Sequence, residues 1–195
     1  MADTPIYNKV SWKPGTQIYP LPAVLVSCGS WERSNFLTVA WTGTICTNPP
    51  MCYISVRPER HSYDLIKERM EFTINLTTRA MARATDWAGV RSGSEYDKWA
   101  ETGLTPARGA NVGCPHIAES PLSVECRVKD IISLGSHDMF IADVVGVLAA
   151  DELIDPESGA FDLARAGLIS YSHGHYFGQG PEIGRFGWSV KKKDK

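Results

Sequence analysis

The sequence predicts a mainly β fold, an antiparallel barrel or sandwich with a few peripheral helices. Short apolar runs rich in β-branched residues recur along the chain, and glycine, proline and asparagine turns separate them. Only two segments show clear helical spacing, and they do not alternate with strands as a parallel sheet requires. At 195 residues the chain suits one domain over residues 1–195, with an N-terminal arm at 1–16 and a basic tail at 191–195.

Composition excludes several classes of protein. A formal net charge of −2 argues against a general nucleic-acid binder. No apolar run is long enough to span a membrane, and the N-terminus lacks a signal-peptide pattern. The 5 cysteines are odd in number, widely spaced and without a CxxC pair, which indicates reduced thiols rather than disulfides. We therefore expect a cytoplasmic protein.

The first 76 residues predict an arm, four strands and a helix. Trp12 and Tyr19 indicate that the proline-rich arm docks on a surface. A polar turn at 31–35 joins the first two strands into a hairpin. Pro58 favours a helix start, and Leu65, Ile66 and Met70 would form its buried stripe. The expected strands are 23–28, 36–41, 51–56 and 72–76, and the helix is 61–69.

The remaining chain predicts a second helix and further strands. Gly89 would end the helix, and the turn-rich region 91–116, helical only around 96–101, has the length of a lid or an interface element. Strict alternation places Glu125 and Arg127 on a solvent-facing side of their strand, whereas the continuous apolar run 140–148 suggests a strand buried on both faces. We expect the helix at 78–88 and strands at 122–128, 140–148, 168–171 and 186–190, with turns at 135–138 and 151–166.

Common catalytic and metal motifs are absent from the sequence. No P-loop, GxSxG elbow or HExxH helix occurs. Gly178, Gly180 and Gly184 lack the spacing and the context of a dinucleotide loop, so we interpret them as turn residues. His173 and His175 could chelate a metal, but no acidic or thiol partner lies at a supporting distance along the chain. A solvated loop is the alternative for the two histidines, and the sequence therefore predicts no metal site and shows no compelling acid–base dyad.

A basic cluster stands at the entrance of the first helix: Arg57, Arg60, His61 and Ser62. Free N–H groups at a helix N-terminus favour an anion, and arginine offers a planar fork of donors to phosphate oxygens. The alternative is an ordinary helix start with exposed basic residues. Three further residues allow two interpretations each. Asn35 and Asn75 could contact a ligand or could satisfy a turn or a barrel corner, and Trp41 could flank a planar ligand or lie in the core.

Twelve short segments, taken in their order along the chain, resemble those of a known protein family. The segments are 22–26, 35–41, 49–50, 54–57, 60–63, 72–76, 92–93, 97–99, 103–104, 125–126, 135–137 and 184–189. Together they resemble the flavin reductase-like family, which has an FMN-binding split barrel of antiparallel Greek-key strands, and its flavoredoxin-type branch in particular. The resemblance covers roughly residues 17 to 190.

The resemblance implies a site for FMN along the segment 35–76. Asn35, Thr38, Val39, Ala40 and Trp41 would border the isoalloxazine and ribityl parts. The ribityl–phosphate part of FMN would meet Ser55, Val56 and Arg57. The phosphate itself would meet Arg60, His61 and Ser62 at the helix entrance. Asn75 would lie near the ring or the ribityl chain, and Tyr171 and His173 would approach from the C-terminal part.

The implied function is that of an FMN-dependent oxidoreductase, with NAD(P)H as a possible electron donor. The cofactor would supply the redox chemistry while the protein sets its position and access. The resemblance also implies a homodimer with FMN near the interface, and a redox partner protein is compatible with it. The alternative is a non-catalytic FMN-binding electron carrier that depends on such a partner, and a barrel that binds another phosphorylated ligand is a third reading.

Overall fold

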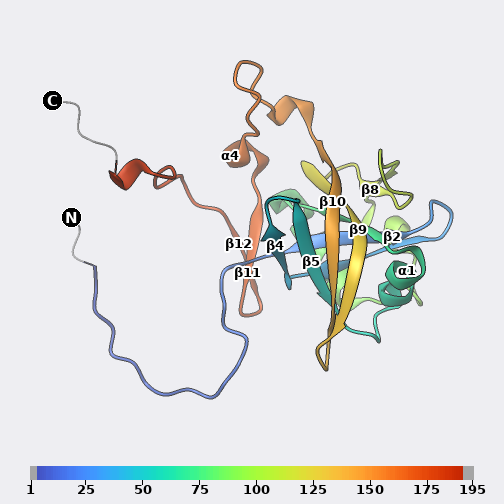
Figure 1. The fold of residues 1–195 in the computed structure, drawn as a ribbon, viewed down its shortest axis with the longest axis horizontal. Helices are drawn as coiled ribbons and strands as arrows, with labels where there is room; N and C mark the ends of the chain where they lie inside the picture. Colours follow the sequence, from blue (N-terminus) through green and yellow to red (C-terminus); the bar gives the residue numbers. More distant parts are fainter. Residues whose placement is uncertain (1–3, 191–195) are drawn as a thin grey trace.

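The computed structural model describes residues 4–190 and is built on one curled antiparallel sheet (Figure 1). Its seven strands follow the order β3-β2-β6-β9-β10-β5-β4. Their bounds are β2 Val24–Gly29, β3 Ser34–Val39, β4 Thr42–Cys46, β5 Met51–Val56, β6 Glu71–Asn75, β9 Leu122–Ser133 and β10 Asp138–Ala149. The predicted mainly β fold with peripheral helices is confirmed, and the strands expected at 23–28, 51–56, 72–76 and 122–128 lie within one residue of these bounds or inside them.

The connection between β3 and β4 explains why the sheet curls. These are the two edge strands, yet only Ala40 and Trp41 join them. Six gaps of about 4.8 Å would separate the edges of a flat sheet by about 29 Å. Three Cα–Cα steps reach about 11 Å at most. The sheet must therefore roll into a half-barrel whose split lies at Ala40 and Trp41, and the strand expected at 36–41 ends two residues early for this reason.

The long hairpin β9–β10 forms the back of the half-barrel. Its register shifts between Ile141 and Ala142 and again between Val144 and Gly146, and such bulges bend a strand. The expectation that 140–148 is buried on both faces is wrong. Phe140 and Ala142 are fully buried, but Val147 is exposed, because only the concave face of a curled sheet meets the core.

The main core fills the concave side of the sheet and is plugged by helix α1 (His61–Arg69). Tyr63, Leu65 and Ile66 enter this core, and the Tyr63 hydroxyl donates to Asp138 Oδ2 over 2.6 Å. Met70 does not complete the expected stripe. It ends the helix in the left-handed conformation, with φ of 53°, and its side chain faces solvent.

A second, smaller core lies on the outer face of β2 and β3, under α2 (Ala82–Val90) and α3 (Lys98–Thr102). The short 3-10 helix η1 (Arg79–Met81) leads into α2, and α2 continues past the predicted end at Gly89. At Gly89 a Cβ atom would lie 3.2 Å from the Thr38 side chain, so glycine here permits close packing of helix on strand rather than a helix stop.

Smaller elements surround the half-barrel. A three-stranded sheet contains β1 (Leu21–Pro22), β11 (Ile169–Ser172) and β12 (His175–Gly178), of which β12 was not expected, and neither was β4. The other pieces are β7 (Pro106–Ala107), β8 (His116–Ile117), η2 (Asp151–Leu153), α4 (Leu163–Ala166) and η3 (Trp188–Val190). The strand predicted at 186–190 is wrong: Gly187 adopts φ of +82°, and η3 follows it without a neighbouring strand.

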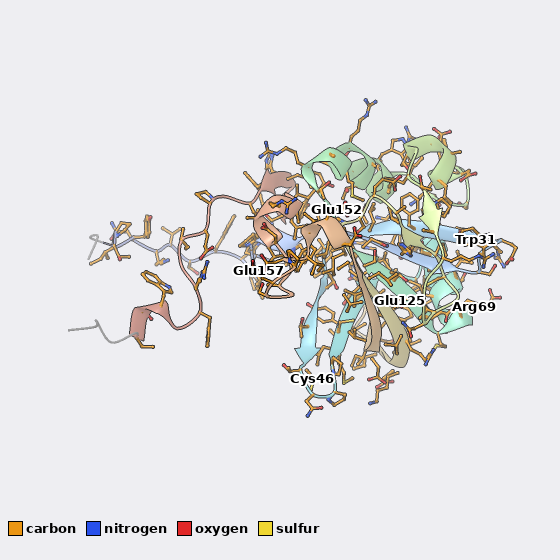
Figure 2. All side chains as sticks on the ribbon, turned by 90° about the horizontal axis from the view of Figure 1, so that it is seen from above. Trp31, Cys46, Arg69, Glu125, Glu152 and Glu157 are labelled. Carbon is orange, nitrogen blue, oxygen red and sulfur yellow. The ribbon has the colours of Figure 1, made fainter. Side chains whose placement is uncertain are left out.

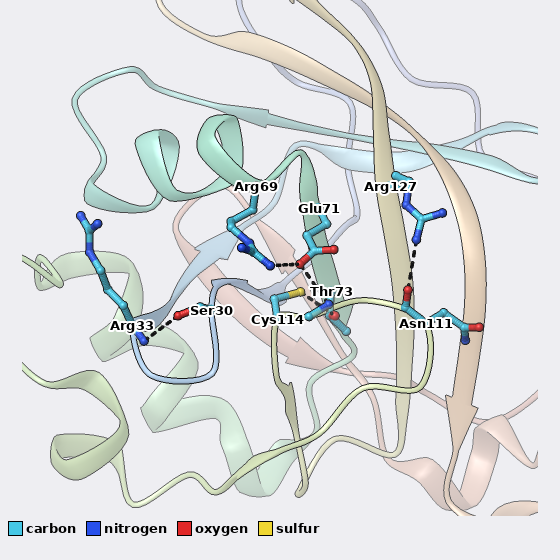
Figure 3. A network of polar contacts seen from close by, with 9 residues as sticks. Ser30, Arg33, Arg69, Glu71, Thr73, Asn111, Cys114 and Arg127 are labelled. Atoms are coloured by element: carbon cyan, nitrogen blue, oxygen red, sulfur yellow. Dashed lines mark hydrogen bonds and ion pairs between the residues drawn. The ribbon is translucent and has the colours of Figure 1, made fainter.

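Glu125 corrects another expectation, since its carboxylate is fully buried rather than solvent-facing. The N–H groups of Ala110 and Asn111 and the Asn111 amide donate to it, and Gly146 leaves it room on the neighbouring strand. Figure 2 marks its place on the sheet, and Figure 3 shows Asn111 accepting in turn from Arg127. These bonds hold the loop 107–115 against the barrel.

Both ends of the described chain leave the body (Figure 1). We define the arm as residues 4–19 and the tail as residues 179–190. The arm was expected to lie on the surface, but Trp12 is 74% exposed and Ile6 is 99% exposed, because the extended arm contacts the body only near Tyr19. The predicted basic tail 191–195 lies outside the described residues. Within residues 4–190 no helix is long and apolar enough to cross a membrane.

Candidate functional site

A cavity of about 510 Å³ opens at the split, and we call it the split cavity. The ends of β3 and β5 form its two walls, and the Ala40–Trp41 connection forms its floor. It brings together nine of the thirteen residues that the sequence assigned to FMN: Thr38, Val39, Ala40, Trp41, Ser55, Val56, Arg57, Arg60 and Tyr171.

A smaller cavity of about 110 Å³ continues from the split cavity, and we call it the basic cavity. Thr38, Arg60 and Gly89 line both. The basic cavity gathers three further predicted residues, Asn35, His61 and Ser62. The polar cluster at the helix entrance is thus joined to the apolar wall of β3.

Hydrogen bonds fix the walls of the basic cavity. Asn35 Nδ2 donates to Ser62 Oγ over 2.7 Å, which ties β3 to the first turn of α1. Arg60 donates to the carbonyl of Gly89 over 3.2 Å, and Thr38 Oγ1 donates to the carbonyl of Thr85. Strand, helix entrance and α2 therefore form one rigid frame around this space.

Lys98 is a cation that the sequence did not assign to the site. Its side chain lines the basic cavity, is only 4% exposed and donates from Nζ to the carbonyl of Ala88 over 2.7 Å. Burial, with a smaller contribution from the charge of Arg60, lowers the pKa of Lys98 to about 8. A lysine can donate three hydrogen bonds, so Ala88 leaves donors for a ligand. Its buried charge makes this cavity receptive to an anion.

His137 faces Trp41 at the floor of the split cavity, with ring centroids 5.2 Å apart. Burial lowers the pKa of His137 below its ordinary value, and Arg57 and Arg60 lower it too. The imidazole is therefore neutral near pH 7. Trp41 remains 43% exposed and offers a planar apolar face to the cavity.

The β11–β12 hairpin forms the rim of the split cavity. Tyr171 and Tyr176 pack edge to face, with centroids 5.6 Å apart. The Tyr176 hydroxyl donates to Asp86 of α2 over 3.3 Å, which links the hairpin to the opposite side of the rim. Burial raises the pKa of Tyr176 to about 12, with Asp86 contributing, so the phenol remains a donor at neutral pH.

Asn75 is the one predicted site residue that lines neither cavity. Its Nδ2 donates to the carbonyl of Leu25 and to Ser27 Oγ, and its Oδ1 accepts from Ser123 and from the N–H of Ile117. The side chain is fully buried and fully bonded inside the protein. Asn75 therefore joins three strands and the β8 segment, away from the cavities. His173, the further C-terminal candidate, packs on Tyr19 instead.

Several cavity residues were not assigned to the site from the sequence. They come from α2, from the segment after it, from the β9–β10 turn and from the hairpin: Asp86, Gly89, Val90, Arg91, Ser92, Gly93, Lys98, His137 and Tyr176. Only the segments 92–93, 97–99 and 135–137 gave a signal, as part of the family pattern, because their proximity to β3 depends on tertiary folding.

Comparison with known proteins identifies the family to which this fold belongs. A family model described as the flavin reductase like domain matches residues 16–178, which is most of the chain. The chain belongs to the flavin reductase-like family. The curled sheet, its split and the two cavities are thus features of a flavin reductase-like protein, and a flavin-related redox function follows from the family.

Individual relatives support the same placement. Flavoredoxin of Desulfovibrio vulgaris (Miyazaki F) has a solved structure that is 30% identical, with a TM-score of 0.87 over 94% of this chain and 100% of that one. An FMN reductase (NADH) of Enterobacter cloacae is 22% identical over 64% of this chain and 73% of its own length. An uncharacterized protein of Aeropyrum pernix is 29% identical over 69% of this chain, and the match spans 52% of that protein.

The residues present fit a phosphorylated flavin. The split cavity offers an apolar slot bounded by Val39, Ala40 and Trp41, as a planar ring system requires. The basic cavity adjoins it and carries Arg60 and Lys98, whose charges suit a phosphate dianion that would otherwise be costly to desolvate, together with His61. A Cβ atom at Gly93 would collide with the Asn35 amide, so glycine is needed to keep this wall in place.

Proposed function

We propose that this protein binds FMN and acts as an FMN-dependent oxidoreductase. The observation that carries the proposal is that a cavity with an apolar wall at Val39, Ala40 and Trp41 adjoins a smaller basic cavity. The two share the lining residues Leu37, Thr38, Arg60 and Gly89. Bound FMN would supply the electron and hydride transfer, and the protein would set its position and access.

Each group of residues has a distinct role in this proposal. Val39, Ala40 and Trp41 would exclude water from one side of the ring, and Ser55 and Arg57 would hold the ribityl and phosphate region from β5. Arg60 and Lys98 would compensate the phosphate charge. Neutral His137 offers a hydrogen bond at the floor of the split cavity, where a positive imidazolium would add repulsion to Arg57.

NAD(P)H is the proposed electron donor. The relative named FMN reductase (NADH) supports a nicotinamide donor, whereas the likeness to a flavoredoxin supports the alternative, an FMN-binding electron carrier that depends on a redox partner protein. Both alternatives share the same FMN site. They differ in whether this chain alone accepts electrons from a nicotinamide.

We also propose that the protein is a homodimer with FMN near the interface and that it works in the cytoplasm. The exposed apolar side chains beside the split cavity, Trp41, Ile45 and Val90, support an interface there. All 5 cysteines are free thiols in the structure, which suits a reducing compartment.

A spectroscopic experiment tests the proposed function. Purified protein, or apoprotein given FMN, should show a bound-flavin absorption spectrum, and a protein that takes up no FMN would refute the proposal. Anaerobic addition of NADH or NADPH should then bleach the flavin band directly. Bleaching only when a separate reductase is added would identify the electron carrier instead.

Replacing Arg57 tests the phosphate side of the site. Arg57→Ala removes a charge-assisted contact, so FMN affinity should fall by about 1.5–3 kcal/mol, which is roughly 10- to 150-fold in Kd. Arg165→Ala is the matched control, because Arg165 is exposed on α4 and lines neither cavity. Titration of apoprotein with FMN measures both variants, and equal affinities for the two would remove Arg57 from the site.

A further inference from the structure

Two arginines of η1 and α2 lie outside both cavities. Arg79 and Arg83 are exposed, and among residues 4–190 neither forms an ion pair with a carboxylate. The nearest acidic residue along the helix, Asp86, accepts a hydrogen bond from Tyr176 instead. Two guanidinium groups without a carboxylate partner can together bind a dianion such as a phosphate.

Helix periodicity places both arginines on the side of α2 that borders the split cavity. η1 runs directly into α2, and at 3.6 residues per turn positions 79, 83, 86 and 90 fall within about 60° of one another. Asp86 and Val90 line the split cavity. The arginines therefore stand on the cavity side of the helix, about one and two turns before Asp86. The opposite face is buried in the smaller core and carries Met81, Thr85 and Ala88.

Contacts with the β11–β12 hairpin support this placement. Tyr176 on β12 donates to Asp86 over 3.3 Å, and a Cβ atom at Gly178 would lie 2.8 Å from Arg79 Nη2. β12 therefore runs beside α2, with the Arg79 guanidinium against its last residue. We call Arg79 and Arg83 the arginine rim, because they continue the rim of the split cavity beyond Asp86 and Tyr176.

The arginine rim serves a different anion from the phosphate of FMN. The basic cavity meets α2 at Gly89, which follows Arg83 by six residues and Arg79 by ten. At 1.5 Å per residue these positions are about 9 and 15 Å from Gly89 along the helix. FMN carries one phosphate, and Arg60 and Lys98 already line the basic cavity. The arginine rim therefore indicates a second anionic site beside the split cavity.

The proposed electron donor brings a second anion to this place. Its nicotinamide must reach the ring in the split cavity, while the tail of FMN occupies the side toward the basic cavity. The rest of the dinucleotide then leaves over the rim that α2 and β12 form. NADPH differs from NADH only by a phosphate on the 2′-oxygen of the adenosine ribose, and an arginine can accommodate this phosphate in a dinucleotide site.

Asp86 is the residue that would favour NADH, because a carboxylate can bond to the free 2′-hydroxyl of that dinucleotide. Among the described residues it is the one acidic side chain that lines the split cavity. Its carboxylate already accepts from Tyr176, and two cations stand beyond it on the same helix face. The balance of charge on this rim therefore favours the phosphorylated dinucleotide.

We propose that the arginine rim binds the 2′-phosphate of NADPH and makes NADPH the preferred electron donor. The donor role rests on the proposed function, whereas binding of the phosphorylated dinucleotide is measured without any electron transfer.

Calorimetric titration with NADP⁺ and with NAD⁺ tests the binding, with FMN in excess and at low ionic strength. The wild-type protein should bind NADP⁺ at least about 10-fold more tightly, as one charge-assisted contact provides. Arg79→Ala and Arg83→Ala should each remove most of this difference while the affinity for NAD⁺ stays the same. Arg33→Ala is the matched control, because Arg33 is also exposed but precedes β3, about 20 Å from Val39 at the cavity.

Three results of the titration would overturn the inference. They are equal affinities of the wild-type protein for NADP⁺ and NAD⁺, no binding of either, and arginine-rim variants that keep the wild-type difference. The difference should also shrink in about 1 M salt, where the Debye length falls to about 3 Å and exposed charges are screened. A preference that salt leaves unchanged would contradict a site built from exposed arginines.

Anaerobic bleaching of the flavin band relates the binding to the donor role. At low donor concentration NADPH should reduce the bound FMN at least about 10-fold faster than NADH, and Arg83→Ala should abolish this advantage without changing the rate at saturating NADPH. Faster bleaching by NADH would overturn the inference. Bleaching by neither dinucleotide would refute the proposed oxidoreductase function, while a calorimetric preference for NADP⁺ that depends on Arg79 and Arg83 would still support the arginine rim.

Discussion

Lys98 should stabilise the bound cofactor while destabilising the empty protein. The folded protein holds the pKa of Lys98 at about 8, below its ordinary value of 10.5. The unfolded chain therefore binds more protons between these values, and stability rises with pH across this window. Below pH 8 the full shift applies, and it corresponds to about 3 kcal/mol of destabilisation. Removing the charge also removes the bond to Ala88, worth about 1 kcal/mol.

We therefore expect Lys98→Met to stabilise the apoprotein by about 2 kcal/mol at pH 7, as measured by urea unfolding. The difference from wild type should shrink and then reverse as the pH rises from 8 to 10.5, because wild-type Lys98 then becomes neutral in both states. A methionine retains the length of the side chain and its packing on Phe36.

FMN binding should respond in the opposite direction. A phosphate dianion favours the charged lysine, so wild-type affinity should fall as the pH rises through about 8, and Lys98→Met should bind FMN more weakly at pH 7 and lose this dependence. The reasoning would be refuted by a variant that is less stable than wild type at pH 7 and binds FMN equally well.

Two further substitutions have defined outcomes. Gly93→Ala places a methyl group against the Asn35 amide and should break its bond to Ser62, so FMN affinity should drop about 10-fold in a titration, whereas Gly180→Ala, with open space around it, should leave affinity unchanged. Glu125→Gln removes the charge that holds Ala110 and Asn111, and should lower the free energy of unfolding by about 2 kcal/mol at pH 7. Burial raises the pKa of Glu125, but hydrogen bonds from Asn111 and its neighbours lower it more, so the pKa lies below its ordinary value of 4.5. The difference in unfolding free energy between variant and wild type should therefore disappear as the pH falls below that value. A difference that persists in acid would contradict this account.

The sequence pattern correctly predicted those strands whose own residues are continuously apolar. All six residues of β2 are buried, and the run 23–28 already indicated this. The pattern failed where a distant segment decides the environment. Glu125 alternates like a surface residue, yet the loop at 110–111 covers it, and Gly89 resembles a helix stop, yet Thr38 packs against it.

The site divides in the same way. The residues contributed by β3, β5 and the entrance of α1 were predictable because they are close in sequence and share the family pattern. Lys98 and Tyr176 could not be assigned from the residues alone, since a lysine in a turn-rich segment and a tyrosine near the C-terminus are ordinary surface residues until the fold buries them. Asn75 is the opposite case. It was assigned to the site because it is a polar residue inside a strand, but its side chain bonds to Ile117 and Ser123 within the protein.

The two-residue connection between β3 and β4 makes the width of the split cavity a matter of chain length rather than of side-chain size. Changing Ala40 or Trp41 alters the lining, but only an insertion lets the two edges of the sheet separate, by up to about 3.5 Å per added residue. Relatives that accept bulkier ring systems could thus arise through a one-residue insertion at this position, a step that leaves the rest of the barrel sequence untouched. The same position is the natural place to engineer this scaffold for an enlarged synthetic flavin.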